Sequence, residues 1–288
     1  MISGIFAGYL RRLGVTDPGK PSAEALFTLQ RAHLERVPYE NIDIQLGRPP
    51  GIAPELSARR FAAGHGGYCF HLNGAFAALL EQLGYDVTRH VAGVYEDSGD
   101  TGVNGNHMAL TVRVDGEAYF VDTGLGDGPF DPLPLREGVH EQGGFRYRLE
   151  RLEGPEGEQT GWSYHSPGGP FPRTNFRSAP AVTADFEAEH LRLSTAEDSP
   201  FVRTLTLLRR DAEGIDLLRG RILYRIDPAK GPSERELGTA EELYEAVSTV
   251  FGRELHDLTP ADRQALWHKV TQAHEAWLSD RDTPPPPA

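Results

Sequence analysis

The sequence has very little cysteine: Cys69 is the only one among its 288 residues. A single thiol excludes a disulfide framework. The chain also has no Cys-x-x-Cys pair and no cluster of histidines and cysteines with the spacing of a structural zinc site. We therefore expect no metal site.

The sequence also lacks a long apolar run and an excess of positive charge. No apolar stretch is long enough to span a bilayer, and Arg11 and Arg12 follow the apolar N-terminal stretch, opposite to the order in a secretory signal. The chain has 29 Lys and Arg and 42 Asp and Glu, which give a formal net charge of −13. We therefore expect a cytoplasmic protein with no nucleic-acid or membrane partner, in which an anionic co-substrate would need a local basic patch. A homo-oligomer is left open.

The order of hydrophobic patterns predicts an α+β fold in three parts. Residues 1–86 are helix-rich and form an N-terminal helical subdomain. Residues 87–201 show short alternating strands with Asp-Gly, Gly-Gly and Pro-rich turns, typical of a small antiparallel β-barrel or sheet. Residues 202–288 combine strands with two helices and are predicted as a C-terminal α/β lid. The chain contains no internal repeat, and its 39% hydrophobic content can bury a large core.

Local sequence signals predict the ends of several helices, and one segment of the chain is rich in arginine. The strands expected between residues 201 and 226 carry five arginines, most of which we expect on a solvated face, with one or two free for a phosphate: Arg209, Arg210, Arg219, Arg221 and Arg225. One helix is predicted to begin near Ser22, a second covers residues 69–83 and is closed by Gly84, and a third covers residues 239–251. A fourth is capped by Thr259 and runs from Pro260 to about Leu278, and residues 284–288 are predicted to form an extended or disordered tail.

Cys69 lies where a glycine pair, Gly66-Gly67, leads into the predicted helix 69–83. At a helix N-terminus, unpaired backbone N–H groups and the helix dipole favour a thiolate, the form that attacks acyl carbons. The alternative is that this cysteine is a small buried hydrophobe, which is the common fate of free cysteines. The glycines and the helix start favour a nucleophile.

Among the eleven histidines, His107 is the one for which the sequence predicts a neighbouring carboxylate. Residues 107–114 and 117–122 read as two strands joined by an Asp115-Gly116 turn. That turn sets a register in which His107 and Asp122 are diagonal neighbours on one face, about 7–8 Å apart between backbones. A slip of one residue would place them on opposite faces. A solvated His-Asp pair is the alternative, and the pattern alone does not bring Cys69 next to them.

The chain resembles the arylamine N-acetyltransferases over nearly its whole length. Each matching motif is short, but their order and spacing together are specific. In chain order they are Tyr9-Leu10-Arg11-Arg12-Leu13-Gly14, Val37-Pro38-Tyr39-Glu40-Asn41, Gly66-Gly67-Tyr68-Cys69-Phe70 with Asn73, Asn106-His107-Met108, Val121-Asp122-Thr123-Gly124-Leu125-Gly126, and Ser194-Thr195-Ala196-Glu197-Asp198-Ser199-Pro200-Phe201.

The resemblance implies a cysteine-protease-like Cys-His-Asp core with Cys69, His107 and Asp122 as the triad. It implies a ping-pong acyl-cysteine mechanism with acetyl-CoA or another thioester as co-substrate, an arylamine or hydrazine as acceptor, and no tightly bound cofactor. By the same resemblance, the substrate-binding residues are Tyr68, Phe70, Asn106, Leu125 and Gly126, and the acyl-donor-binding residues are Val103 and Asn104. A phosphate-loop interpretation of residues 124–128 is weak, because this segment opens no clear helix.

The chain departs from the family pattern at two positions next to the motif of Cys69. Where the family has Arg before the two glycines and Glu two residues after the cysteine, this chain has His65 and His71. In the family that Arg is expected to pair with Glu40, as a structural brace of the nucleophile's loop. We expect His65 to replace it as the partner of Glu40, charged only at low pH. His71 is expected to bond backbone groups instead.

Three other functions stay open from the sequence. An amide synthase of the same fold would take a long acyl chain from an acyl carrier protein and cyclise it, using the same triad. A cysteine hydrolase shares the triad but passes the acyl group to water. A non-catalytic binding module could keep the fold without the reaction. The fate of the acyl-enzyme distinguishes a hydrolase, which passes the acyl group to water, from a transferase, which passes it to an amine.

Overall fold

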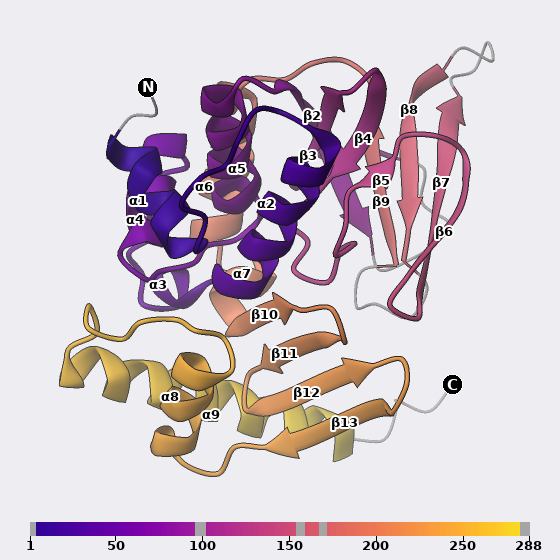
Figure 1. Ribbon diagram of the computed structural model, residues 1–288. Coiled ribbons are helices and arrows are strands. Elements are labelled where there is room, and N and C mark those ends of the chain that lie inside the picture. The colour runs from indigo at the N-terminus through magenta and orange to yellow at the C-terminus, as the bar shows by residue number, and fades with distance from the viewer. Residues whose placement is uncertain (1–3, 96–101, 154–158, 167–171, 283–288) are drawn as a thin grey trace, which may run out of the picture.

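The computed structural model describes residues 4–95, 102–153, 159–166 and 172–282 of the chain. N-terminal helices pack beside a curved sheet, and a second, smaller sheet with its own helices lies below them in Figure 1. The fold is therefore α+β, as the sequence predicts. The N-terminal helices are α1 (Gly4–Arg12), α2 (Ala23–Arg36), α3 (Ile42–Gln45), α4 (Pro54–Ala62) and α5 (Cys69–Leu83).

The larger sheet is antiparallel and nearly closed. Its strands are β2 (Asp86–Tyr95), β3 (His107–Val114), β4 (Glu117–Val121), β5 (Leu133–Pro134), β6 (Gly138–Gln142), β7 (Phe145–Glu153), β8 (Gln159–His165) and β9 (Arg173–Arg177). They follow the order β5-β4-β3-β2-β9-β8-β7-β6. The two ends approach each other, because the Gln142 side chain exchanges two hydrogen bonds of 3.0 Å with the backbone of Asp131. This closure gives the barrel that the turn pattern predicts.

The smaller sheet joins a segment near the N-terminus to the C-terminal part of the chain. Its strands are β1 (Tyr39–Glu40), β10 (Thr206–Arg210), β11 (Ile215–Arg219), β12 (Ile222–Asp227) and β13 (Gly231–Glu236), paired in that order. One face packs on α8 (Ala240–Thr249) and α9 (Pro260–Asp282), where Leu207 and Leu218 meet Leu243 and Leu266 in a buried cluster. Both C-terminal helices lie where the sequence predicts them.

Residues 183–203 contain three short helices, whereas the pattern predicts strands up to about Phe201. They form a 3-10 helix (Thr183–Phe186), α6 (Glu187–Thr195) and α7 (Pro200–Arg203). The expectation is wrong here because the local helix signals outweigh a weak alternation. Acidic residues occupy the first turn of α6, and Ser199 caps α7 by accepting a hydrogen bond from the Phe201 amide at 3.2 Å.

The prediction that most of the five arginines between residues 201 and 226 lie on a solvated face is also wrong. Four of the five side chains have structural partners, because strand positions in a two-sided sheet are only partly exposed. Arg209 donates to Val250 O, Arg210 is buried over the Phe145 ring, Arg221 donates to Leu237 O, and Arg225 pairs with Asp211. Arg219 alone of the five is exposed and has no side-chain hydrogen bond or ion pair within the described part of the chain.

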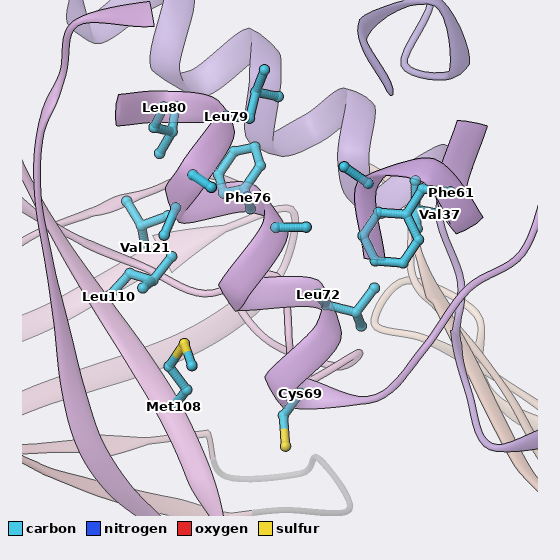
Figure 2. Packing of buried hydrophobic residues seen from close by; sticks show 14 of the residues in the cluster. Val37, Phe61, Cys69, Leu72, Phe76, Leu79, Leu80, Met108, Leu110 and Val121 are labelled. Atoms are coloured by element: carbon cyan, nitrogen blue, oxygen red, sulfur yellow. The ribbon is translucent and has the colours of Figure 1, made fainter. Parts of the chain in front are cut away.

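The helix that carries Cys69 has the ends that the sequence predicts. The Tyr68 amide bonds His71 Nδ1 at 3.4 Å at its start, and Gly84 closes it in the left-handed region at a φ of 92°. Nearly every residue of α5 is buried. Figure 2 shows Leu110 and Val121 of the barrel together on one side of the helix that carries Phe76, Leu79 and Leu80, with the Cys69 sulfur at the other end, pointing away from this packing. The apolar core therefore fixes the helix that presents the thiol.

The hairpin of β3 and β4 has the predicted register. Val114 pairs with Glu117 and Leu110 with Val121 across the Asp115-Gly116 turn. Asp115 and Gly116 both have positive φ, 53° and 79°, as this turn type requires.

The loop before Cys69 is fastened to β1. Tyr39 bridges to Gly67, and the Glu40 amide donates to Gly67 O at 2.9 Å. A Cβ at Gly66 would lie 2.1 Å from Pro38 O, so only glycine fits at this contact. Because β1 also pairs with β10, this loop is held by the C-terminal sheet as well as by the helix that follows it.

The brace of this loop is not the predicted one. Glu40 Oε1 accepts from the Gly66 amide at 3.3 Å and lies 3.4 Å from Nε of Arg253, which is fully buried. Arg253 also forms two bonds of 2.8 Å to the Asp257 carboxylate. His65 lies 3.7 Å from Asp257 and makes no ion pair with Glu40 among the described residues. The prediction of a His65–Glu40 pair is therefore wrong, because a side chain from far along the chain supplies the guanidinium.

The charge state of His65 also differs from the prediction. Burial, together with the nearby guanidinium groups of Arg253 and Arg60, lowers the pKa of His65 to about 4. The imidazole is therefore neutral at physiological pH and cannot brace the loop by charge. His71 agrees with its prediction: its two ring nitrogens lie 3.4 Å from the Tyr68 amide and 3.3 Å from Pro50 O.

We predict that Arg253→Met lowers the free energy of unfolding by about 3 to 5 kcal/mol, because it leaves the buried Glu40 carboxylate without its cation. The exposed Arg59 provides the matched control, and Arg59→Met should change the value by less than about 0.5 kcal/mol. Urea unfolding measures both. The double variant His65→Arg/Arg253→His should be more stable than Arg253→His alone, because it returns a guanidinium to the cluster; equal stability would mean that position 65 does not reach Glu40.

We predict that His65 lowers the free energy of unfolding at acid pH. Its folded-state pKa of about 4 lies below the value of about 6.5 for an unfolded chain, so the unfolded state binds the proton first as the pH falls. Its contribution is complete above about pH 6.5 and is lost toward pH 4. Between pH 7 and pH 4.5, the free energy of unfolding should therefore fall less for His65→Asn than for the wild type. Urea unfolding at each pH measures this fall. Parallel curves would contradict this.

Candidate active site

The three expected triad residues lie at the start of α5, at the start of β3 and directly after β4. Cys69 is the first residue of α5, His107 is the first residue of β3, and Asp122 directly follows β4. All three are buried. His107 Nε2 lies 2.7 Å from Asp122 Oδ2, and the Cys69 side chain is close enough to the imidazole to contribute to its raised pKa. Since Asp122 engages Nε2, the other ring nitrogen, Nδ1, is left for the sulfur.

Asp122 is held by four hydrogen-bond donors. Besides His107 at Oδ2, its Oδ1 accepts from the Asn73 amide at 2.9 Å, from the Gly124 N–H at 2.8 Å and from the Leu125 N–H at 3.1 Å. A fully buried carboxylate with this set of donors has its orientation fixed. It therefore fixes the plane and the tautomer of the imidazole as well.

His107 has a perturbed proton affinity. Burial alone would lower the pKa of His107, but the charge and hydrogen bond of Asp122, together with Cys69, raise it to about 10. The imidazole is therefore protonated at neutral pH. A protonated imidazole beside a thiol is the arrangement that favours a thiolate-imidazolium ion pair.

Asn73 is a site residue to which the sequence analysis gave no role. One turn after Cys69, its Nδ2 donates to Met108 O at 2.6 Å and to Asp122, while its Oδ1 accepts from the Thr123 N–H at 2.8 Å. One amide thus joins α5, β3 and the end of β4. Its match to the family pattern, three residues after the Gly-Gly-Tyr-Cys-Phe motif, was the signal that could have identified it.

A cavity of about 260 Å³ opens onto Cys69 and His107. Of the substrate residues expected from the sequence, Asn106 and Leu125 line it. The side chain of Asn106 bonds both backbone groups of Val94, and its carbonyl lies 3.6 Å from Cys69 Sγ. The wall next to the thiol is therefore rigid. The complete lining is Tyr39, Cys69, Val94, Asn106, His107, Gly124, Leu125, Arg192, Leu193, Pro200 and Phe201.

The other expected substrate and donor residues do not line this cavity. Tyr68 and Phe70 are fully buried behind its wall, where the Tyr68 hydroxyl lies 2.5 Å from His190 Nδ1. Gly126 packs against Leu208 and Tyr39. Val103 is half-buried and Asn104 exposed, just before Asn106 in the chain.

The sequence analysis missed several lining residues because they come from distant segments. Tyr39, Leu193, Pro200 and Phe201 belong to β1, α6 and α7. Tyr39, Pro200 and Phe201 lie in motifs that carry the family resemblance, and this was the available signal. Gly124 is needed for a different reason, since a Cβ there would lie 2.9 Å from the Cys69 Cα.

Within the described residues, no group of three or more His, Cys, Asp or Glu side chains is placed to hold a metal ion. Nor is any helix in that part of the chain both long and apolar enough to cross a bilayer. The chemistry of the site is that of a buried thiol, an imidazole and a carboxylate.

A family model of N-acetyltransferases matches residues 22–259, which include all three triad positions. An arylamine N-acetyltransferase of Mycolicibacterium smegmatis is 30% identical over 267 residues, 90% of this chain and 95% of that protein. Proansamycin X synthase of Amycolatopsis mediterranei is 33% identical over 151 residues, 50% of this chain and 58% of the synthase.

The fold is shared with solved structures of the same kind. The structure of Mycobacterium marinum arylamine N-acetyltransferase in complex with CoA matches with a TM-score of 0.82 and 24% identity, over 93% of this chain and 98% of that one. Sequence and fold matches both span nearly the whole chain. The chain thus belongs to the arylamine N-acetyltransferase family and is an acyltransferase.

Proposed function

We propose that the protein transfers an acetyl group from acetyl-CoA to the nitrogen of an arylamine or hydrazine through an acyl-Cys69 intermediate. The observation that carries the proposal is the hydrogen bond between Asp122 and His107, with His107 and Cys69 side by side in the lining of a small cavity. Such an arrangement supplies a nucleophile, a proton carrier and a group that orients the carrier.

In the first half-reaction the Cys69 thiolate attacks the thioester carbonyl. The N–H groups of Cys69 and Phe70, which have no backbone partner within the described chain, would stabilise the oxyanion at the start of α5. The C–S bond to the coenzyme then breaks, and the His107 imidazolium gives its proton to the leaving CoA thiolate. The products are acetyl-Cys69, free CoA and a neutral imidazole.

In the second half-reaction the amine nitrogen attacks the acetyl-enzyme. His107 takes one proton from nitrogen, the C–S bond to Cys69 breaks, and the ion pair is restored. Weakly basic nitrogens suit this step, because they stay unprotonated and nucleophilic at neutral pH. The apolar residues of the cavity, among them Leu125, Leu193 and Phe201, fit an aromatic acceptor.

The size and burial of the site favour acetyl transfer over the two enzymatic alternatives. A cavity of about 260 Å³ lies at the small end of ligand sites and is narrow for the long chain that an amide synthase cyclises. A buried triad with an apolar lining disfavours water as the acceptor, and therefore disfavours a hydrolase.

We predict that acetyl-CoA without acceptor adds one acetyl group to the protein, and that Cys69→Ser abolishes this adduct, because Cys69 is the only thiol in the chain. Intact-protein mass spectrometry measures the adduct. A panel of arylamines should discharge it faster than water does. An adduct that survives Cys69→Ser would refute the mechanism, discharge by water alone would indicate a hydrolase, and loading only from a carrier-bound long chain would indicate an amide synthase.

We predict that Asp122→Asn slows acylation by about three to four orders of magnitude, as misorienting the base does in other triads. The amide can still occupy the pocket made by Asn73 and the two backbone N–H groups, so the fold should be kept. Single-turnover acetylation followed by mass, together with circular dichroism, separates the two effects. Near-normal acylation by a folded variant would remove Asp122 from the triad.

A further inference from the structure

One polar group in the lining of the catalytic cavity has no hydrogen-bond partner in the described part of the chain, and this is the Tyr39 hydroxyl. The other polar side chains of the lining are engaged. Asn106 bonds both backbone groups of Val94, and Arg192 donates two hydrogen bonds of 2.9 and 2.5 Å to the Glu189 carboxylate. The thiol and the imidazole belong to the triad. The phenol is therefore the group left for a ligand.

The Tyr39 phenol is nearly buried and stays protonated. The residue is 5% exposed, and a buried donor without a partner loses the free energy of its hydrogen bonds to water. Burial raises the pKa of the phenol above its usual value, and the negative charges of Cys69 and Asp127 raise it further. The hydroxyl therefore keeps its proton at working pH and can donate it in a hydrogen bond.

The backbone fixes the direction of the Tyr39 side chain. The residue pairs with Leu208 of β10 on one side and bridges to Gly67 on the other. Side chains alternate along a strand, and the next residue, Glu40, faces the buried brace, so the phenol faces the cavity. Gly126 packs closely against it, since a Cβ there would lie 3.2 Å from the Tyr39 Cβ. The ring is therefore held firmly in the cavity wall.

The phenol and the Cys69 thiol border the same small space. Much of the remaining lining is apolar and includes Leu125, Leu193 and Phe201. An aromatic ring that presents its amine to Cys69 would therefore lie beside the phenol. An oxygen or nitrogen on that ring can accept the hydrogen of the phenol, whereas a hydrocarbon substituent leaves the buried donor unsatisfied.

We propose that Tyr39 determines acceptor specificity by donating a hydrogen bond to an oxygen or nitrogen atom carried on the aromatic ring of the amine. This rests on the proposed function, which makes an arylamine the acceptor. The preferred acceptors are then arylamines with a hydrogen-bond-accepting ring substituent, such as an alkoxy or hydroxyl group. Arylamines with a hydrocarbon group of the same size are poorer acceptors. The selection acts in the second half-reaction, in which the amine attacks acetyl-Cys69.

The test uses matched pairs of acceptors and the full-length protein. Methoxyaniline and ethylaniline have substituents of similar size, and only the first carries an ether oxygen. The acetyl-enzyme is formed with acetyl-CoA, and its discharge by the ortho, meta and para isomers gives a second-order rate constant for each amine. The ratio of the two rate constants is compared between the wild type and Tyr39→Phe, which cancels the intrinsic reactivity of each amine. For at least one isomer, the preference for the ether should fall about tenfold in the variant.

Tyr85→Phe is the matched control. Tyr85 is also nearly buried, but its hydroxyl bonds Ser22 and the residue lies outside the cavity lining. Its ratios should equal those of the wild type. Circular dichroism checks that both variants are folded. Equal ratios in the wild type and Tyr39→Phe for all three isomer pairs would overturn the proposal, because the hydroxyl would then not distinguish the acceptors.

A second measurement does not need the acetyl-enzyme. Methoxybenzene and ethylbenzene lack the amine, and each should protect Cys69 from alkylation by iodoacetamide, as followed by intact-protein mass. The ratio of their half-protecting concentrations should favour methoxybenzene severalfold more in the wild type than in Tyr39→Phe. The same ratio in both proteins would overturn the assignment. If acetyl-CoA does not load Cys69, the proposed function fails, and the protection experiment still decides whether Tyr39 binds a ring oxygen.

Discussion

The buried carboxylate of Asp122 is the interaction on which the site depends. A carboxylate without solvent must be fully hydrogen-bonded, and here the donors come from α5, from the start of β3 and from the turn after β4. Satisfying this one group therefore fixes the relative positions of the helix with the thiol and the hairpin with the imidazole. The raised pKa of His107 is a direct consequence, since the same carboxylate stabilises the imidazolium.

The second constraint comes from the C-terminal part of the chain. The loop before Cys69 pairs with β1, which is an edge strand of the smaller sheet, and Glu40 in that strand lies 3.4 Å from the buried Arg253. The walls of the catalytic cavity likewise come from α6 and α7. The loop before Cys69 is thus held by residues that lie far apart in sequence, and residues of both sheets, such as Tyr39 and Val94, line the cavity beside the thiol.

Local signals predicted the elements that carry the triad. The glycine at position 84 and the pattern after Cys69 give the bounds of α5, and the Asp115-Gly116 turn gives the register of the hairpin, because both depend only on nearby residues. The errors arose where the outcome depends on distant partners. His65 was assigned to Glu40, but Arg253 occupies that place, and four of the arginines expected in solvent found partners on other strands or loops.

By itself the sequence determined the single thiol, its place at a helix start, the His107–Asp122 register and, through the order of its motifs, the family. These follow from covalent order and short-range backbone preferences. Tertiary structure alone decided that Asn73 ties the three elements together, that α6 and α7 close the cavity, and that the Tyr39 hydroxyl borders it without a hydrogen bond to the described chain. Such contacts join residues far apart in the chain, and burial and hydrogen bonding select them only once the whole chain has packed.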